Sequence, residues 1–210
     1  MAQLELLIES IMSLWFIYPA LGLFVIGDAL IPFIPAETLL TLASSWTGSR
    51  GIPNFWGIFF TGLIAAMIGD NLSYFLGGRM FRAGRKFRRL PGASKVVTAV
   101  EWAQGAVTEK PGFTIIVARF IPWARWVLTI ILGSTRYPWW KFFIFDTIGA
   151  AIWSFQACCV GYVGGRLVSE YPLIGMVIGL ILGGLVGFGI DRIGSHYREF
   201  RQIQSATASA

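Results

Sequence analysis

Long apolar stretches separated by short polar ones dominate the pattern of this chain. Four of them have enough residues to cross a hydrocarbon core of about 30 Å as helices, namely residues 11–27, 55–78, 142–165 and 171–190. Two further apolar stretches, 28–48 and 111–134, are interrupted by proline and by charge. Broken segments occur at membrane depth where protein or a water-filled cavity surrounds them. The pattern therefore predicts an all-α integral membrane protein with four spanning helices and two re-entrant hairpins.

Composition supports a membrane location and gives the chain an expected orientation. Hydrophobic residues make up 55% of the sequence and charged residues 13%, which is unlike a soluble domain. The basic residues behind the net charge of +6 gather at span ends and within 79–110. With two re-entrant hairpins, the positive-inside rule places them on the cytoplasmic side with both termini, and only Arg50 and Arg166 remain outside. We therefore expect anionic lipid headgroups rather than nucleic acid beside this basic arm.

A repeated tripeptide indicates an internal duplication. Phe33-Ile34-Pro35 recurs 87 positions later as Phe120-Ile121-Pro122, and further identities follow at the same offset. We expect two inverted copies, about 28–79 and 111–166, with Pro35 and Pro122 at the hairpin tips because proline fixes φ and removes a backbone donor. The basic arm 79–110 would join them. The last span 171–190 and a polar tail 193–210 would complete a single membrane domain, 1–210.

Six charged residues stand inside the apolar regions: Asp28, Glu37, Asp70, Arg119, Arg125 and Asp146. Each would cost roughly 2.5–3.5 kcal/mol at the bilayer centre without a partner or water. The repeat alignment brings Glu37 close to Arg125, so this pair is expected. Asp70 could serve either arginine, and Asp146 could pair with Lys141 or Arg119.

These residues suggest an anion site with a proton-responsive side. Arginine carries a planar fork of donors that suits phosphate oxygens, so Arg119 and Arg125 are candidates for a phosphorylated headgroup. Glu37 or Asp70, in an apolar pocket, could bind and release a proton. Asp28 is either a third such group or a solvated carboxylate. Tyr74, four residues after Asp70, is either a half-buried aromatic or a hydroxyl that orients Asp70 or the headgroup. The alternative is a set of ion pairs that only dock the hairpins.

The inventory of other reactive residues is small. Cys158 and Cys159 are adjacent in a predicted span and are interpreted as packing thiols, and the single histidine, His196, lies in the tail. A histidine-dependent phosphatase or protease would lack its base. We therefore expect no enzyme, no metal and no cofactor.

The charged motifs resemble those of the DedA family, also called the VTT or SNARE-associated family. Asp28-Ala-Leu-Ile-Pro-Phe-Ile-Pro-Ala-Glu37 is similar to its acidic segment, Gly69-Asp70 with Tyr74 to its Gly-Asp-x-x-x-Tyr motif, and Arg119-Phe-Ile-Pro-Trp-Ala-Arg125 to its Arg-Phe-x-Pro-x-x-Arg motif. Gly133 also matches, and the resemblance covers about 25–165. The departures are Asp28 in place of Glu, Trp123-Ala124 where the family often has glycine first, and Asp146 where asparagine is expected.

The resemblance implies a substrate that composition alone does not. Bacterial members would return undecaprenyl phosphate, or a related phospholipid, across the cytoplasmic membrane with dependence on the proton gradient. The alternatives are a proton-driven carrier of small ions or organic cations, an energy-independent lipid scramblase, and a partner-binding membrane module. A homodimer is one alternative to a monomer.

Overall fold

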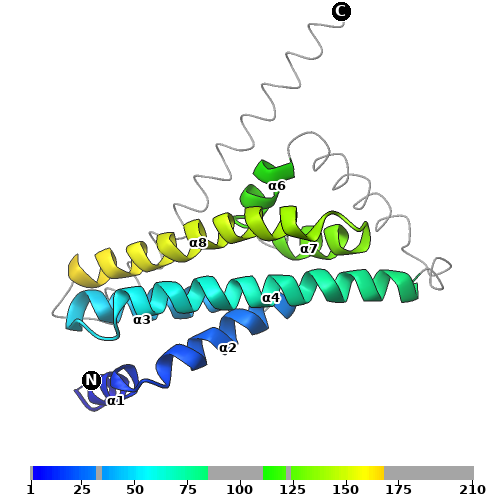
Figure 1. Ribbon diagram of the computed structural model, residues 1–210. Helices are drawn as coiled ribbons and strands as arrows, with labels where there is room; N and C mark the ends of the chain where they lie inside the picture. Colours follow the sequence, from blue (N-terminus) through cyan, green and yellow to red (C-terminus); the bar gives the residue numbers. More distant parts are fainter. Residues whose placement is uncertain (1, 32–34, 85–110, 122–123, 168–210) are drawn as a thin grey trace, which may run out of the picture.

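The computed structural model describes residues 2–31, 35–84, 111–121 and 124–167, and in these parts the regular structure is entirely α-helical (Figure 1). The helices are α1 (Ala2–Ser13), α2 (Ile17–Leu30), α3 (Ala36–Arg50), α4 (Phe55–Gly84), α6 (Pro111–Ala118), α7 (Ala124–Ser134) and α8 (Trp139–Leu167).

Two helices are each long and apolar enough to cross a membrane. They are Phe55–Arg79 within α4, with 25 residues, and Trp139–Leu167, which is all of α8, with 29. These confirm the predicted spans 55–78 and 142–165. The α4 helix continues to Gly84, so the first residues of the predicted basic arm are helical. The rest of that arm, the predicted span 171–190 and the polar tail lie outside the described residues.

The predicted spanning helix over 11–27 is not continuous. The chain bends by 89° between α1 and α2, which together form a broken apolar pair. Turn hydrogen bonds close the bend, from the Leu14 amide to the Ile11 carbonyl and from the Ile17 amide to the Leu14 carbonyl. Apolarity is uninterrupted through this bend, so hydropathy alone does not reveal it. The described residues therefore hold two spanning helices, or three if the bent pair counts as one.

Both proline-containing segments are helix breaks. The first separates α2 from α3, which begins directly after Pro35. The second separates α6 from α7, and these two helices fill the predicted limits 111–134. Pro122 lies outside the described residues. Residue 28, the expected start of the first hairpin, lies inside α2, which runs continuously from Ile17 to Leu30. The order helix, break, helix, long helix thus occurs twice.

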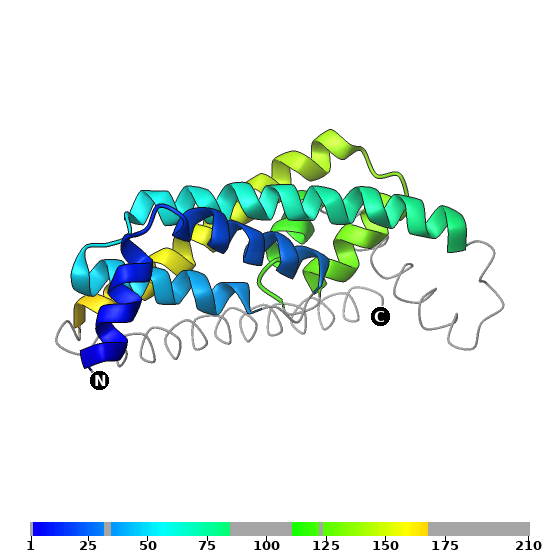
Figure 2. The ribbon, with the colours of Figure 1, turned by 90° about the horizontal axis from the view of Figure 1, so that it is seen from below.

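We call the two occurrences of this order, α2 to α4 and α6 to α8, the two copies, and they exchange helices. The long helices α4 and α8 run in opposite directions and cross (Figures 1 and 2). The first helix of each break packs on the long helix that follows it, α2 on α4 and α6 on α8. The second helix packs mainly on the long helix of the other copy, α3 on α8 and α7 on α4. Neither copy can therefore be separated from the other without exposing buried helix faces.

Glycines permit this exchange by bringing backbones into contact. A Cβ added to Gly161 or Gly165 of α8 would overlap a backbone carbonyl of α3, that of Thr41 or Ser45 respectively. A Cβ on Gly133 of α7 would likewise overlap the Tyr74 carbonyl of α4. Small residues at such crossings are typical of helix packing in membranes, where close van der Waals contact drives association.

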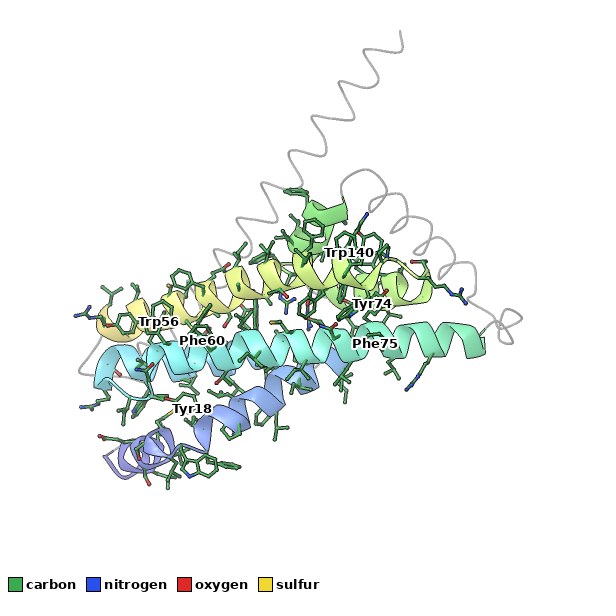
Figure 3. The ribbon with its side chains drawn as sticks, in the orientation of Figure 1. Tyr18, Trp56, Phe60, Tyr74, Phe75 and Trp140 are labelled. Carbon is green, nitrogen blue, oxygen red and sulfur yellow. The ribbon has the colours of Figure 1, made fainter. Side chains whose placement is uncertain are left out.

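Aromatic side chains mark the two ends of the long helices. Trp56 and Phe60 lie near one end of α4, whereas Phe75 and Trp140 lie toward the other end of the bundle (Figure 3), and all four are exposed. Phe75, which stacks on Trp139 at 6.3 Å between ring centroids, follows Trp56 by 19 residues, or about 28 Å of helix, so two tryptophans mark this spacing. This spacing fits aromatic belts on either side of a hydrocarbon core.

Candidate functional site

The helix ends that flank the two breaks meet beside α4. The indole Nε1 of Trp126, at the start of α7, donates to the Leu30 carbonyl at the end of α2, at 3.3 Å. The end of α2 is also tied to α4, because the Ser73 hydroxyl donates to the Ala29 carbonyl at 2.6 Å. Gly69 leaves room for this approach, since a Cβ there would lie 2.5 Å from the Ala29 Cβ. Both contacts bring Asp28 to the same place as Asp70 and Arg125.

Five charged side chains form a continuous series here, which we call the ion-pair chain. In order they are Asp28, Arg125, Asp70, Arg119 and Asp146. Arg125 Nη2 lies 2.9 Å from Asp28 Oδ2, and its Nη1 lies 2.5 Å from Asp70 Oδ1. Arg119 Nη2 lies 2.7 Å from Asp70 Oδ2, and its Nη1 lies 2.7 Å from Asp146 Oδ1. Each oxygen of Asp70 thus faces a different arginine.

One end of the ion-pair chain is partly exposed, and its other three members are buried. The side chains of Asp28 and Arg125 are 24% and 18% exposed, whereas those of Arg119 and Asp70 are 4% and 1% exposed. Asp146 is 4% exposed. The ion-pair chain therefore has an accessible end at Asp28 and a buried end, called the sealed end below, at Asp146.

Helix α8 holds the sealed end. Asp146 binds Arg119 rather than Lys141, so of the two predicted partners the structure selects the arginine. Lys141 instead lies over the Trp140 ring, at 5.3 Å from its centroid. The Arg119 guanidinium lies 5.7 Å from the Trp153 ring centroid, a cation–π contact that our sequence reasoning missed. Trp153 follows Asp146 by two helical turns, so helical periodicity could have identified it.

The buried end is not fully hydrogen-bonded. The contact between Arg119 and Asp70 Oδ2 is an ion pair without hydrogen-bond alignment, so this oxygen has no hydrogen-bond partner among the described residues. The same holds for Asp146 Oδ2 and Arg119 Nε. With three carboxylates and two guanidinium groups, the ion-pair chain also carries more acidic than basic groups. It therefore retains acceptor capacity for a proton or another donor.

The predicted pair between Glu37 and Arg125 is wrong. Both terminal nitrogens of Arg125 are bound to Asp28 and Asp70, and Glu37 makes no ion pair among the described residues. The repeat alignment related Glu37 to Arg125 only by sequence offset, which does not specify contact. Glu37 lies in the first turn of α3, and its side chain is exposed. Partial burial nevertheless raises the pKa of its carboxyl, and the negative charge of Asp28 raises it further.

The spacing of Tyr74 suggested a contact with Asp70 that the structure does not form. Its hydroxyl donates to the Tyr137 carbonyl, and its ring stacks on Phe142 at 4.8 Å between centroids. Figure 3 shows Tyr74 in the space between α4 and α8. This residue joins α4 to the turn before α8, which favours the buried aromatic interpretation over a headgroup ligand.

The side chains at this place suit ion binding and proton exchange. No group of three or more residues that could hold a metal ion occurs in the parts of the chain that the structure describes. Apolar helices, two of them long enough to cross a bilayer, enclose paired charges where helix breaks meet. These features define an α-helical integral membrane protein.

Comparison with known proteins assigns the family. The model of the VTT domain matches residues 34–163, which include the end of the first helix break, the whole second break, all of α4 and most of α8. The chain belongs to this family, that of the DedA membrane proteins.

Three relatives from bacteria show the extent of the similarity. The chain is 29% identical to "Uncharacterized membrane protein Rv0364" of Mycobacterium tuberculosis over 173 residues, covering 78% of this chain and 70% of that protein. It is 27% identical to "Protein DedA" of Escherichia coli over 168 residues, covering 76% and 75%. The match to "Uncharacterized membrane protein ML0287" of Mycobacterium leprae, at 26% over 152 residues, covers 69% of this chain but only 64% of that protein. No solved structure matches the chain.

Proposed function

We propose that this protein moves an anionic lipid across the cytoplasmic membrane of a bacterium, with protons as the coupling ion. The observation that carries the proposal is the pair of arginines at the meeting point of the two helix breaks, with a carboxylate held between them. The guanidinium of Arg125, at the accessible end, has a planar fork of donors suited to a phosphate headgroup, and Arg119 holds the carboxylate beside it. Undecaprenyl phosphate, or a related phospholipid, is the substrate class we favour.

A purely structural role for the ion-pair chain is less consistent with its cost. Two guanidinium groups and three carboxylates at this depth require desolvation, and apolar residues of similar volume would often dock helices equally well. Retention of so many charges in one place favours a role in binding ions.

We infer that each helix break is the tip of a re-entrant hairpin. Helices α2 and α3 have 14 and 15 residues, and α6 and α7 have 8 and 11. At 1.5 Å per residue, the longest of them reaches only about 22 Å, less than the ~30 Å hydrocarbon core. The opposite directions of α4 and α8 support an inverted repeat, an arrangement in which transporters place broken helices at the substrate site.

Transport of a phosphorylated lipid in liposomes tests the proposal. Purified protein should move a labelled polyprenyl phosphate between leaflets, and Arg125→Gln should lower the rate by about tenfold or more, because charge-assisted hydrogen bonds to the headgroup are lost. A labelled neutral lipid of the same chain length serves as the control. Absence of movement of either lipid by folded protein would contradict lipid transport. Equal movement of both, without a proton gradient, would identify an energy-independent scramblase.

Proton coupling should depend on Glu37. Its raised pKa means that the carboxyl holds a proton at a higher pH than an ordinary glutamate, so it titrates closer to neutral pH. We expect the transport rate of Glu37→Gln to depend less on pH than that of the wild type, with the largest difference above the raised pKa, where only the wild type is charged. Rates measured from pH 5 to pH 8.5 with equal pH on both sides would show this. An unchanged profile would remove Glu37 from the coupling and leave Asp28 and Asp70.

The excess of carboxylates over arginines supports a second candidate function, that of a proton-driven carrier of small ions or organic cations. In that case a pH gradient should drive uptake of a cation into liposomes that contain no phosphorylated lipid. The positive charges of Arg119 and Arg125 oppose cation entry, so we favour the lipid.

A further inference from the structure

The two arginines of the ion-pair chain differ in how firmly they are held. Arg119 is bound on both sides by nearly inaccessible carboxylates and packs over Trp153. Arg125 and its partner Asp28 form the accessible end. A ligand that approaches the ion-pair chain in this structure therefore meets Asp28 and Arg125 first.

Asp28 occupies the donors that such a ligand would need. Arg125 Nη2 lies 2.9 Å from the Asp28 carboxylate and 3.4 Å from its backbone carbonyl, while Nη1 binds the buried Asp70. A phosphate binds a guanidinium through two oxygens side by side, so it requires Nη2. Two anions at one nitrogen repel each other, and the partly exposed carboxylate is the one that can leave.

We propose that Asp28 competes with the anionic headgroup for Arg125, so that the carboxylate closes the empty site and the headgroup replaces it on binding. The inference rests on the proposed function, because its ligand is a lipid phosphate. A terminal monoester phosphate is the class that fits, since it presents several unesterified oxygens to one guanidinium. Arg119 is then a positioning residue, which holds Asp70 beside Arg125 without touching the headgroup.

The surrounding charges link this exchange to protons. Arg125, Asp70 and Arg119 face Asp28 from α7, α4 and the break after α6, and Glu37 is close enough on α3 to influence it. Helix α1 packs at the opposite end of α2 (Figure 1). Once released from Arg125, Asp28 retains two acidic neighbours, Asp70 and Glu37, so loss of its partner favours protonation. Headgroup binding and proton binding at Asp28 should therefore promote each other.

Binding of farnesyl phosphate to the purified full-length protein in detergent tests the competition, with farnesol as the neutral comparison. Asp28→Asn keeps the shape of the side chain and removes its charge, so we expect about fivefold tighter binding of farnesyl phosphate and no change for farnesol. Asp28→Ser is a second variant with the same expectation, for use if Asp28→Asn lowers the melting temperature.

Glu37→Gln is the matched control. It removes the same charge close to Asp28 but from a residue that makes no ion pair with Arg125 among the described residues. If Asp28 competes with the headgroup, Glu37→Gln should increase the affinity for farnesyl phosphate by less than about twofold. Equal increases in affinity for Asp28→Asn and Glu37→Gln would mean that any nearby negative charge weakens binding, and would overturn the proposed competition.

The arginines provide a separate readout, the ratio of affinities for farnesyl phosphate and farnesol. Arg119→Lys, which keeps a positive charge beside Asp70, should preserve this ratio, whereas Arg125→Lys should reduce it because the planar fork is lost. The reverse result would assign the headgroup to Arg119. A wild-type protein that binds neither ligand would contradict the proposed function itself. A wild type that binds the phosphate while Asp28→Asn gains nothing would overturn only the competition.

Discussion

Asp70→Ala is expected to lower the free energy of unfolding by roughly 3–5 kcal/mol, because it removes the shared partner of two arginines. Asp70 is 1% exposed and contacts Arg119 and Arg125 through different oxygens. Without it, Arg119 keeps Asp146 and Arg125 keeps Asp28, but each guanidinium loses a charged neighbour in an apolar environment. Thermal or denaturant unfolding in detergent, followed by tryptophan fluorescence, would measure the effect.

Asp28→Ala is the appropriate comparison for that variant. It removes a carboxylate from the same ion-pair chain, but the pair it breaks is partly exposed, so solvent compensates for much of the loss. We expect it to cost less than half as much as Asp70→Ala. Equal destabilisation by Asp28→Ala and Asp70→Ala would mean that the difference in burial between these two members of the ion-pair chain has no effect on stability.

Gly165→Ala is expected to destabilise the protein by about 3 kcal/mol, the upper part of the usual range for overpacking. The added Cβ would meet the Ser45 carbonyl of α3, a backbone atom that cannot rotate away. Relief requires α3 to move away from α8, which loosens the packing around Trp46 and Ser44, both fully buried. Unfolding in detergent measures this, and retention of wild-type stability would show that the helices are less closely packed.

Gly22→Ala provides a matched control in another helix. A Cβ on Gly22 would lie 3.6 Å from Thr61 Cγ2 and 3.8 Å from Ala65 Cβ, which are ordinary contacts. Alanine is also favoured over glycine within helices, by up to about 1 kcal/mol. This variant should therefore be as stable as the wild type or more so. If both variants destabilised the protein equally, the cause would be a general sensitivity of its helices rather than contact at α8.

Some elements of the fold were predictable because one local property determines them. Uninterrupted apolar sequence was sufficient for the two long helices, and proline beside charge was sufficient for the breaks before α3 and α7. Polarity does not mark the bend between α1 and α2, because Trp15 and Phe16 are as apolar as their neighbours and are exposed at the bend. The local signal there is Pro19 in the first turn of α2, a position that proline tolerates at a helix start but not within a continuous helix. The apolarity of a segment indicates how favourably it transfers into lipid, but it does not indicate the direction in which the helix runs.

The site shows the same division between local and tertiary information. Hydrophobic surroundings were sufficient to identify all five members of the ion-pair chain, since charge in an apolar region requires a partner. The choice of partner was predicted only in part. Asp28 reaches Arg125 because Gly69 and Ser73 dock the end of α2 on α4, and this docking depends on contacts between helices. Sequence offset between repeats could not substitute for it, which is why Glu37 was paired wrongly.

The exchange of helices between the two copies has a consequence for how the protein is made. Helix α3 ends at Arg50, whereas α8, on which it packs, begins at Trp139. At about 5–20 residues per second, the ribosome needs roughly 5–20 seconds to synthesise the intervening chain. During that interval the buried face of α3, with Thr41, Ser44 and Ser45, lacks its final partner. Biogenesis thus requires the first half to wait in the membrane, shielded by lipid or by the insertion machinery, until the second half arrives.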